Sequence, residues 1–219
     1  MIKIAPSILS ADFSDLRSEL DICVAGSADY IHIDVMDNHF VPNLTIGPVV
    51  VKSIRPFSKS YFDVHLMVTD PQKLLNPFVD SGADGITFHI EAIKDPGDMC
   101  DQIRSTGVDV GISLKPSTSI ENIIPFLDKV DRVLIMSVEP GFGGQKFIDS
   151  SIEKIKSLDK ILNKYNLEKV EIEVDGGIKL ENANDVISAG ADALVVGSGI
   201  FKSEDPVNQI IKFKDLARL

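Results

Sequence analysis

The sequence predicts a single-domain α/β fold, a (β/α)8 barrel, and three observations support this fold class. Short runs rich in β-branched and aromatic residues alternate along the chain with longer stretches that carry apolar residues at helical spacing. Eight such units fit into 219 residues, whereas the alternative, an open doubly wound sheet, normally has fewer strands. No linker, charge block or low-complexity tract divides the chain, so we expect one domain over residues 1–219.

The expected strands are short apolar runs, several of which follow turns of small residues. In chain order they are Ile2–Ile8, Tyr30–Val35, Phe62–Val68, Gly85–His89, Val108–Leu114, Arg132–Val138, Lys169–Val174 and Ala193–Val196. The turns at residues 25–29, 81–84 and 189–192 each combine Gly with Ala and Asp just before a strand. This repetition is typical of one helix-stop device used three times.

The expected helices lie between these strands and carry apolar residues on one face. They are Ser14–Ala25, Pro71–Ser81, Pro96–Ser105, Ile120–Leu127, Ile148–Tyr165, Leu180–Ala189 and, closing the chain, Pro206–Leu216. Because a helix connects most consecutive strands, the strands should run parallel, with their carboxyl ends at one rim of the barrel.

Composition excludes several classes of partner. The chain has 22 Lys and Arg against 33 Asp and Glu, a net charge of −11, and no dense basic cluster, so we expect no binding to nucleic acid. No apolar run approaches the roughly 20 residues that cross a bilayer, and the first residues lack a secretory signal. The two cysteines, Cys23 and Cys100, lie in expected helices and suggest a reducing compartment. We therefore expect a cytoplasmic protein without a membrane segment.

Two histidines and two aspartates stand where expected strands end. His32 and Asp34 are two residues apart on one strand and so share a face, His65 is near the end of the next strand, and Asp175 follows the seventh. Barrel active sites occupy the carboxyl ends of the strands. Two imidazoles with two carboxylates suit one divalent transition metal, such as Zn, Fe, Mn or Co. Of the other histidines, His89 is either a second-layer or a packing residue, and His39 lies in a loop and is expected to ligate nothing.

Glycines form a second group, on the loops after the last three strands. Of 15 glycines, eight lie between Gly141 and Gly199. The loops carry Gly141-Phe142-Gly143-Gly144, Asp175-Gly176-Gly177 and Gly197-Ser198-Gly199. Glycine lets backbone N–H groups approach an anion, and a phosphate site after strands seven and eight is common in such barrels.

Ser7, after the first strand, is either a substrate hydroxyl contact or a turn residue. Met36, Met67 and Met136 either fill the top of the barrel core or line the site.

A metal beside a phosphate cradle suggests a phosphorylated sugar whose carbonyl and adjacent hydroxyl bind the cation. The neighbouring C–H is then acidic, because the metal stabilises the enediolate that forms when the proton leaves. If Asp34 and Asp175 lie on opposite faces of the substrate, one removes a proton and the other returns one from the far side, which inverts the carbon.

Several motifs in the same order along the chain resemble those of ribulose-phosphate 3-epimerases. The most specific is residues 34–43, Asp-Val-Met-Asp-Asn-His-Phe-Val-Pro-Asn, and others are Ala5–Ser10, Asp63–Met67, Val138–Gln145, Val174–Gly177 and Val196–Ser198. The resemblance covers nearly the whole chain. It implies a barrel of the ribulose-phosphate binding type that interconverts D-ribulose 5-phosphate and D-xylulose 5-phosphate, in the pentose phosphate or reductive carbon-fixation pathways, and homo-oligomers are common in this family.

The resemblance also assigns roles to residues. It implies that His32, Asp34, His65 and Asp175 bind the metal, that Asp34 accepts the proton and that Asp175 donates it. The substrate contacts that it implies are Ser7, His65, Gly141, Phe142, Gly143, Gly144, Asp175, Gly176, Gly177, Gly197 and Ser198. One position departs from the family: Asn38 stands where the motif usually has Gly, which puts closure of that loop in doubt.

Three other functions stay open from the sequence. An epimerase of the same mechanism could act on a six-carbon ketose phosphate such as D-allulose 6-phosphate. A metal-independent barrel decarboxylase or isomerase could share the phosphate loops. A non-catalytic phosphate-binding barrel would bind ligand without turnover.

Overall fold

The computed structural model describes residues 2–216, which form eight parallel strands with helical structure between them. The strands are β1 (Lys3–Pro6), β2 (Tyr30–Met36), β3 (Tyr61–Met67), β4 (Gly85–His89), β5 (Asp109–Leu114), β6 (Arg132–Met136), β7 (Glu171–Asp175) and β8 (Ala193–Val196). All eight expected strands are present, with ends shifted by up to two residues. β1 is shorter than expected because the Ser7 side chain accepts a hydrogen bond from Leu9 N–H and starts a 3-10 turn at Ile8–Ser10.

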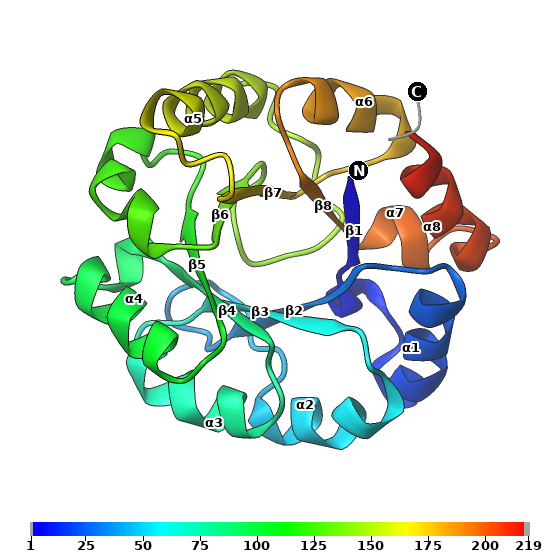
Figure 1. Ribbon diagram of the computed structural model, residues 1–219. Coiled ribbons are helices and arrows are strands. Elements are labelled where there is room, and N and C mark those ends of the chain that lie inside the picture. Colours follow the sequence, from blue (N-terminus) through cyan, green and yellow to red (C-terminus); the bar gives the residue numbers. More distant parts are fainter. Residues whose placement is uncertain (1, 217–219) are drawn as a thin grey trace.

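The helices form a ring outside the strands (Figure 1). They are α1 (Leu16–Ala25), α2 (Pro48–Ile54), α3 (Leu75–Asp80), α4 (Pro96–Ser105), α5 (Ser151–Tyr165), α6 (Leu180–Ser188), α7 (Ser198–Phe201) and α8 (Pro206–Asp215). The expected helix at Pro71–Ser81 begins as a 3-10 turn, Pro71–Leu74. Within residues 2–216, every helix is too short or too polar to span a bilayer.

Three differences from the expected helices have local causes. Ile120–Leu127 forms two 3-10 turns, Ile120–Asn122 and Ile124–Lys129, instead of an α-helix, because Pro125 lacks the N–H that a regular helix needs there. Helix α2 was not expected because its valines favour strands; Pro48 starts it, and burial of Val51 and Ile54 stabilises it. Helix α7 was not expected either, and its four residues are too few to show a helical period.

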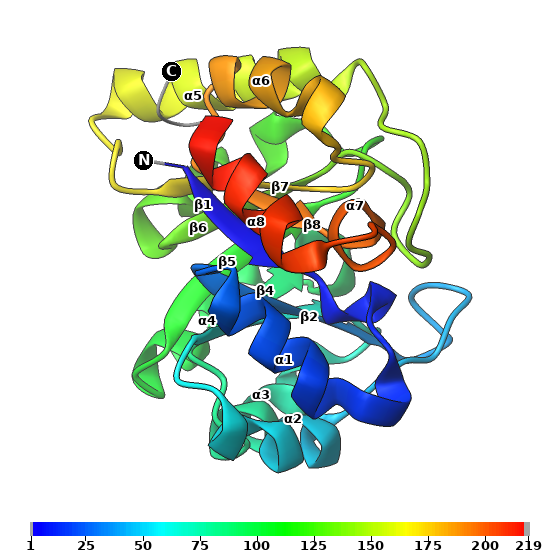
Figure 2. The same ribbon diagram turned by 90° about the vertical axis from the view of Figure 1, so that its right-hand side faces the viewer.

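The sheet closes into a barrel at a short seam between its first and second strands. Its order is β1-β8-β7-β6-β5-β4-β3-β2, and all neighbouring strands in this order are parallel. An isolated parallel bridge, Ser7 to His32, joins the end of β1 to β2. Figure 2 shows β1 lying against β8, with α8 packed outside both. The closing bridge therefore lies at the strand ends that carry the predicted site.

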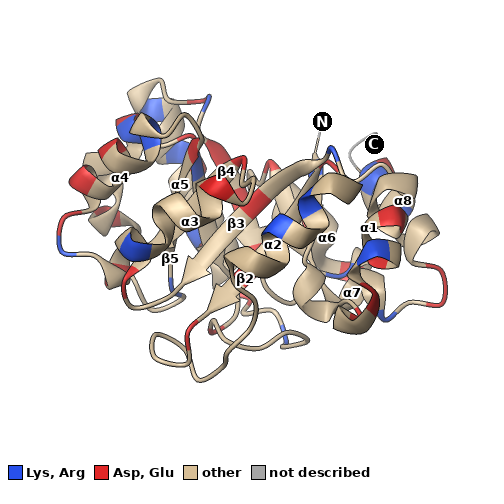
Figure 3. Ribbon diagram, turned by 90° about the horizontal axis from the view of Figure 1, so that it is seen from below, with Lys and Arg blue, Asp and Glu red and all other residues tan. Residues whose placement is uncertain are grey.

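Alternation along β2 separates apolar residues that face the helices from polar residues that face the barrel interior. On β2, Ile31, Ile33 and Val35 belong to the main core between strands and helices, while His32 and Asp34 point inward and are also buried. The outside of the molecule carries both signs of charge: Figure 3 shows basic residues interspersed with acidic ones over the helices. The interior polar residues thus come from the sequence period that also builds the core.

Asn38, the departure from the family motif, has the left-handed backbone conformation that the turn requires. Its φ is +58°, and its N–H donates to Asn43 O at 2.8 Å. The Asp37 carboxylate beside it accepts from the backbone N–H groups of His39 and Phe40. Asn adopts this conformation more readily than most residues do, so the turn forms without glycine. Asn43 Nδ2 in turn donates to Gly141 O at 2.8 Å, tying this loop to the glycine loop after β6.

Replacing Asn38 by Ala should lower the free energy of unfolding by about 1 kcal/mol, because Ala has no side chain to compensate a left-handed backbone. Asn38→Gly is the matched control and should change the stability much less, since glycine adopts this conformation freely. Urea unfolding of both variants tests this. Equal losses in the two variants would contradict it.

Candidate active site

The candidate site is built around Asp34 near the carboxyl end of β2. Ser7 Oγ donates to Asp34 Oδ2 at 2.5 Å, and His65 Nδ1 lies 3.2 Å from Asp34 Oδ1. His32 Nε2 is 3.4 Å from the same Oδ1. The parallel register of β2 and β3 places Asp34 opposite His65, so the sheet itself fixes this contact. All four side chains are buried.

Asp175 joins this group from the other side of the barrel. It ends β7, which lies across the barrel from β2 (Figure 1). One potential ligand atom from each of His32, Asp34, His65 and Asp175 lies within 4.8 Å of all the others. The four residues that the sequence pointed to as metal ligands are therefore together in the fold.

The chemistry of this group fits a divalent transition metal. His32 Nε2 is buried and has no hydrogen-bond partner among the described residues, although it faces the cluster. Its other ring nitrogen, Nδ1, lies 2.6 Å from Asp63 Oδ2. An imidazole held by a carboxylate on one nitrogen and open on the other is the usual arrangement of a metal-binding histidine. Two imidazoles and two carboxylates are a donor set that such metals accept.

The two aspartates have opposite ionisation tendencies. Burial raises the pKa of Asp175 to about 7, and the negative charge of Asp34 adds to this effect. Burial also acts to raise the pKa of Asp34, but interactions with His32 and then His65 outweigh it and hold that pKa well below its usual range. One carboxyl group thus tends to keep a proton while the other stays ionised, as a pair of acid and base requires.

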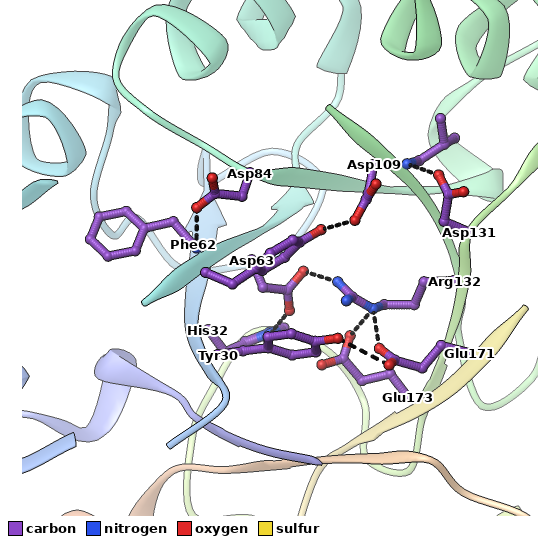
Figure 4. A network of polar contacts seen from close by, with 12 residues as sticks. Tyr30, His32, Phe62, Asp63, Asp84, Asp109, Asp131, Arg132, Glu171 and Glu173 are labelled. Atoms are coloured by element: carbon purple, nitrogen blue, oxygen red, sulfur yellow. Dashed lines mark hydrogen bonds and ion pairs between the residues drawn. The ribbon is translucent and has the colours of Figure 1, made fainter. Parts of the chain in front are cut away.

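A network of charges beneath the cluster was not foreseen from the sequence (Figure 4). Asp63 bridges His32 and Arg132: its Oδ1 lies 2.5 Å from an Arg132 guanidinium nitrogen. Arg132 Nε also lies 2.9 Å from Glu171 and 3.4 Å from Glu173. Asp63 is two residues before His65 and opposite His32 in the strand register. The two-residue period indicates its inward position, but no sequence signal gives its partners.

A pocket opens above the cluster, at the carboxyl ends of the strands. Of the predicted substrate contacts, those lining it are Ser7, Gly141, Phe142, Gly143, Gly144, Asp175, Gly176, Gly177, Gly197 and Ser198. Asp34 and the three strand-end methionines, Met36, Met67 and Met136, line it too, as does the basic residue Lys179. His65 is fully buried and is not among the lining residues. The glycine loops and the acidic pair therefore share one pocket.

Close approach of backbone requires glycine after Asp175. A Cβ on Gly177 would lie 2.4 Å from Phe147 N and 2.9 Å from Gln145 O. A Cβ on Gly176 would likewise lie 2.8 Å from Val138 N, and the φ of Gly176 is +124°, a conformation that favours glycine. Ser137 Oγ donates to the carbonyl oxygens of Asp175 and Gly176 at 2.9 and 2.7 Å. These contacts pack the loops after β6 and β7 together and fix the backbone next to the acidic pair.

The other histidines lie outside the four-residue group. His39 is exposed, and its Nδ1 lies 2.8 Å from Asp37 O. His89, which the sequence left as a second-layer or packing residue, is buried with its Nε2 2.9 Å from His65 Nε2. His89 thus contacts a candidate ligand.

Comparisons with known proteins agree on one family. The sequence model described as the ribulose-phosphate 3 epimerase family matches residues 3–201. The chain is 46% identical over 208 residues to "Ribulose-phosphate 3-epimerase, cytoplasmic isoform" of Oryza sativa subsp. japonica, covering 93% of this chain and 89% of that protein. It is 46% identical over 205 residues to the ribulose-phosphate 3-epimerase of Bacillus subtilis (strain 168), covering 94% of both chains.

Solved structures share the architecture. KGPDC from Streptococcus mutans superposes with a TM-score of 0.70 at 16% identity, covering 100% of this chain and 98% of that one. Orotidine 5'-phosphate decarboxylase from Pyrococcus horikoshii OT3 gives 0.69 at 15% identity, covering 99% of each chain. At such identities the likeness shows the barrel fold alone.

In metal-free protein, the raised pKa of Asp175 should make stability depend on pH. The unfolded carboxyl ionises near pH 4, whereas the folded one keeps its proton to about pH 7. The free energy of unfolding should therefore fall as pH rises between these values, relative to Asp175→Asn, which lacks the titrating group. Urea unfolding in the presence of chelator, at several pH values, measures this. A stability difference that does not change with pH would contradict the assignment.

Proposed function

The chain belongs to the ribulose-phosphate 3-epimerase family, and on this basis we propose that it interconverts D-ribulose 5-phosphate and D-xylulose 5-phosphate by exchanging the proton at C3. It is an epimerase acting on a pentose phosphate. The observation that carries the proposed mechanism is the pair of Asp34 and Asp175, which reach one pocket from strands across the barrel with opposite ionisation tendencies.

The proposed cation ligands are His32, Asp34, His65 and Asp175, for one divalent metal per subunit of the Zn, Fe, Mn or Co kind. When bound, such a cation supplies a Lewis acid that polarises the substrate carbonyl and offsets the negative charge of the enediolate. His32 Nε2, which has no hydrogen-bond partner within residues 2–216, supports this assignment.

Asp34 is the proposed base in the direction from ribulose to xylulose. Its ionised carboxylate accepts the C3 proton, and the hydrogen bond from Ser7 Oγ to Oδ2 fixes the orientation of the group. Asp175, protonated at the start, donates a proton to the opposite face of the planar enediolate and so inverts C3. The reverse reaction exchanges the two roles, which requires that each group change its protonation state once per turnover.

The glycine loops are the proposed phosphate site. Gly141, Gly143, Gly144, Gly176, Gly177, Gly197 and Ser198 line the pocket together with Phe142 and Lys179, so backbone N–H groups can surround an anion there. Met36, Met67 and Met136 also line this pocket and offer thioether surface without a competing base. Direct contact between substrate and the buried His65 stays a prediction.

The setting of the reaction is also a proposal. We infer a cytoplasmic homo-oligomer of the pentose phosphate pathway, with one domain over residues 1–219 and no nucleic-acid partner. The name of the rice relative, a cytoplasmic isoform, supports the compartment.

Incubation of the protein with D-ribulose 5-phosphate in deuterated water should produce D-xylulose 5-phosphate labelled at C3, because the returned proton comes from a group that exchanges with solvent. Proton NMR of C3 follows both events. Absence of C3 deuterium and of xylulose product would exclude the proposed reaction.

The matched variants for this assay are Asp175→Asn and Asp149→Asn. Loss of the proposed acid should reduce turnover by about 10²- to 10⁴-fold or more, with the barrel still folded by circular dichroism. Asp149 is an exposed carboxylate of the loop between β6 and α5, and its change should have little effect. Full activity of Asp175→Asn would remove this residue from the mechanism.

Exhaustive chelation should abolish epimerisation, because four convergent donors then hold no cation. Re-addition of Zn, Fe(II), Mn or Co ions, one at a time, should restore activity to different extents and so rank the metals. Unchanged activity in chelated protein, shown by elemental analysis to be free of metal, would favour a metal-independent reaction.

A further inference from the structure

We propose that His89 and Glu91 are positioning residues that fix the tautomer of His65, so that the Nδ1 lone pair of His65 faces the cation site. The inference rests on the metal site proposed above and assigns a role to two residues outside it. It concerns a row of three side chains, His65, His89 and Glu91, that runs from the barrel interior toward the surface.

Short polar contacts connect the row. His65 Nε2 lies 2.9 Å from His89 Nε2, and the two ring planes differ by 28° with their centroids 5.0 Å apart. His89 Nδ1 lies 3.1 Å from Glu91 Oε2. Both imidazoles are fully buried, so water does not supply other partners for their nitrogens. At the inner end, His65 Nδ1 lies 3.2 Å from Asp34 Oδ1, on the side of the candidate ligands.

The hydrogen positions in this row depend on one another. A neutral imidazole has one N–H and one lone pair, and a single hydrogen fits between two nitrogens 2.9 Å apart. If His65 binds a cation through Nδ1, its hydrogen is on Nε2 and is donated to His89 Nε2. His89 must then carry its own hydrogen on Nδ1, where Glu91 Oε2 accepts it.

With a cation bound on the Nδ1 side of His65, the opposite arrangement fails at both ends. It would put the hydrogen of His65 on Nδ1, directed at the cation. It would also leave the lone pair of His89 Nδ1 facing a carboxylate oxygen at 3.1 Å, with two acceptors and no hydrogen between them. Glu91 therefore selects the one tautomer of His65 that can bind metal from this side.

Glu91 is itself held in place from outside the barrel. Its Oε1 accepts from Lys115 N–H at 2.8 Å and from Thr118 Oγ1, which leaves Oε2 for His89. The segment that supplies these donors is tied down by Lys154 Nζ of α5, which donates to the carbonyl oxygens of Lys115, Pro116 and Thr118. The carboxylate thus has a fixed direction, which a positioning role requires.

The other imidazole ligand has an equivalent partner. Asp63 Oδ2 lies 2.6 Å from His32 Nδ1, and Arg132 holds the other oxygen of Asp63. Each candidate ligand histidine is therefore oriented by a carboxylate, directly for His32 and through His89 for His65. Such outer partners typically contribute 10- to 100-fold to metal affinity.

The test compares His89→Leu with His89→Gln by zinc binding to metal-free protein, measured by competition with a chromophoric chelator. His89→Leu removes the acceptor for His65 Nε2–H and should weaken zinc binding about 10- to 100-fold. His89→Gln keeps an oxygen near the position of Nε2 and should lose clearly less. Thr87→Val is the control and should bind zinc as the unchanged protein does. Thr87 lies on the same strand as His89, and its hydroxyl has no hydrogen-bond partner in the part of the chain that the structure describes.

Glu91→Gln provides a second, less disruptive variant, because Glu91 is partly exposed. It should also weaken zinc binding, since an amide nitrogen facing His89 Nδ1 favours the wrong tautomer. In zinc-loaded protein with ¹⁵N-labelled histidine, NMR should find the hydrogen of His89 on Nδ1 and that of His65 on Nε2. A purely structural role would not determine these tautomers.

The outcomes separate this inference from the proposed function. Unchanged zinc affinity in both His89→Leu and Glu91→Gln, or the opposite tautomers in the NMR spectrum, would overturn the positioning role while the metal site stands. If the unchanged protein catalyses epimerisation but binds no divalent metal, the metal site and this inference both fail.

Discussion

A buried carboxylate can stay ionised inside a packed barrel only if hydrogen bonds or opposite charges replace the water it has lost. The upper part of this barrel is arranged around that constraint. Asp34 is balanced by Ser7, His32 and His65, and Asp63 by His32 and Arg132. Removing one partner from such a set leaves a neighbouring charge uncompensated. The site and the interior of the fold are consequently one electrostatic unit.

The same constraint explains the different behaviour of Asp34 and Asp175. Asp34 has cationic and hydrogen-bonding partners on several sides, whereas burial and the nearby charge of Asp34 act together on Asp175. Two chemically identical side chains thus differ in their tendency to hold a proton because of their surroundings. The proposed mechanism also needs access to both faces of one carbon, and the origin of the two aspartates on strands across the barrel is consistent with that requirement.

The sequence was sufficient to predict the eight strands and the convergence of His32, Asp34, His65 and Asp175. Strand ends in a barrel converge, and residues such as His32 and Asp34 are chemically conspicuous at such positions. It was not sufficient for Asp63 and Arg132, because their pairing depends on the register between neighbouring strands and on which charges point inward. Nor did it indicate α2, where local preference favours a strand and burial of Val51 and Ile54 decides otherwise.

Barrel closure also bears on the order in which the molecule is completed. Strand β1 pairs with β8, and Ser7 N–H donates to Val196 O, so the first and last strands of the barrel meet beside the pocket. Translation produces β1 long before β8 exists, and domains form as their contacts become available. A polypeptide that stops before β8 lacks one neighbour of β1 and, with Gly197 and Ser198, part of the pocket wall. Catalytic competence is thereby acquired late in biosynthesis, and partial chains cannot present a finished binding surface.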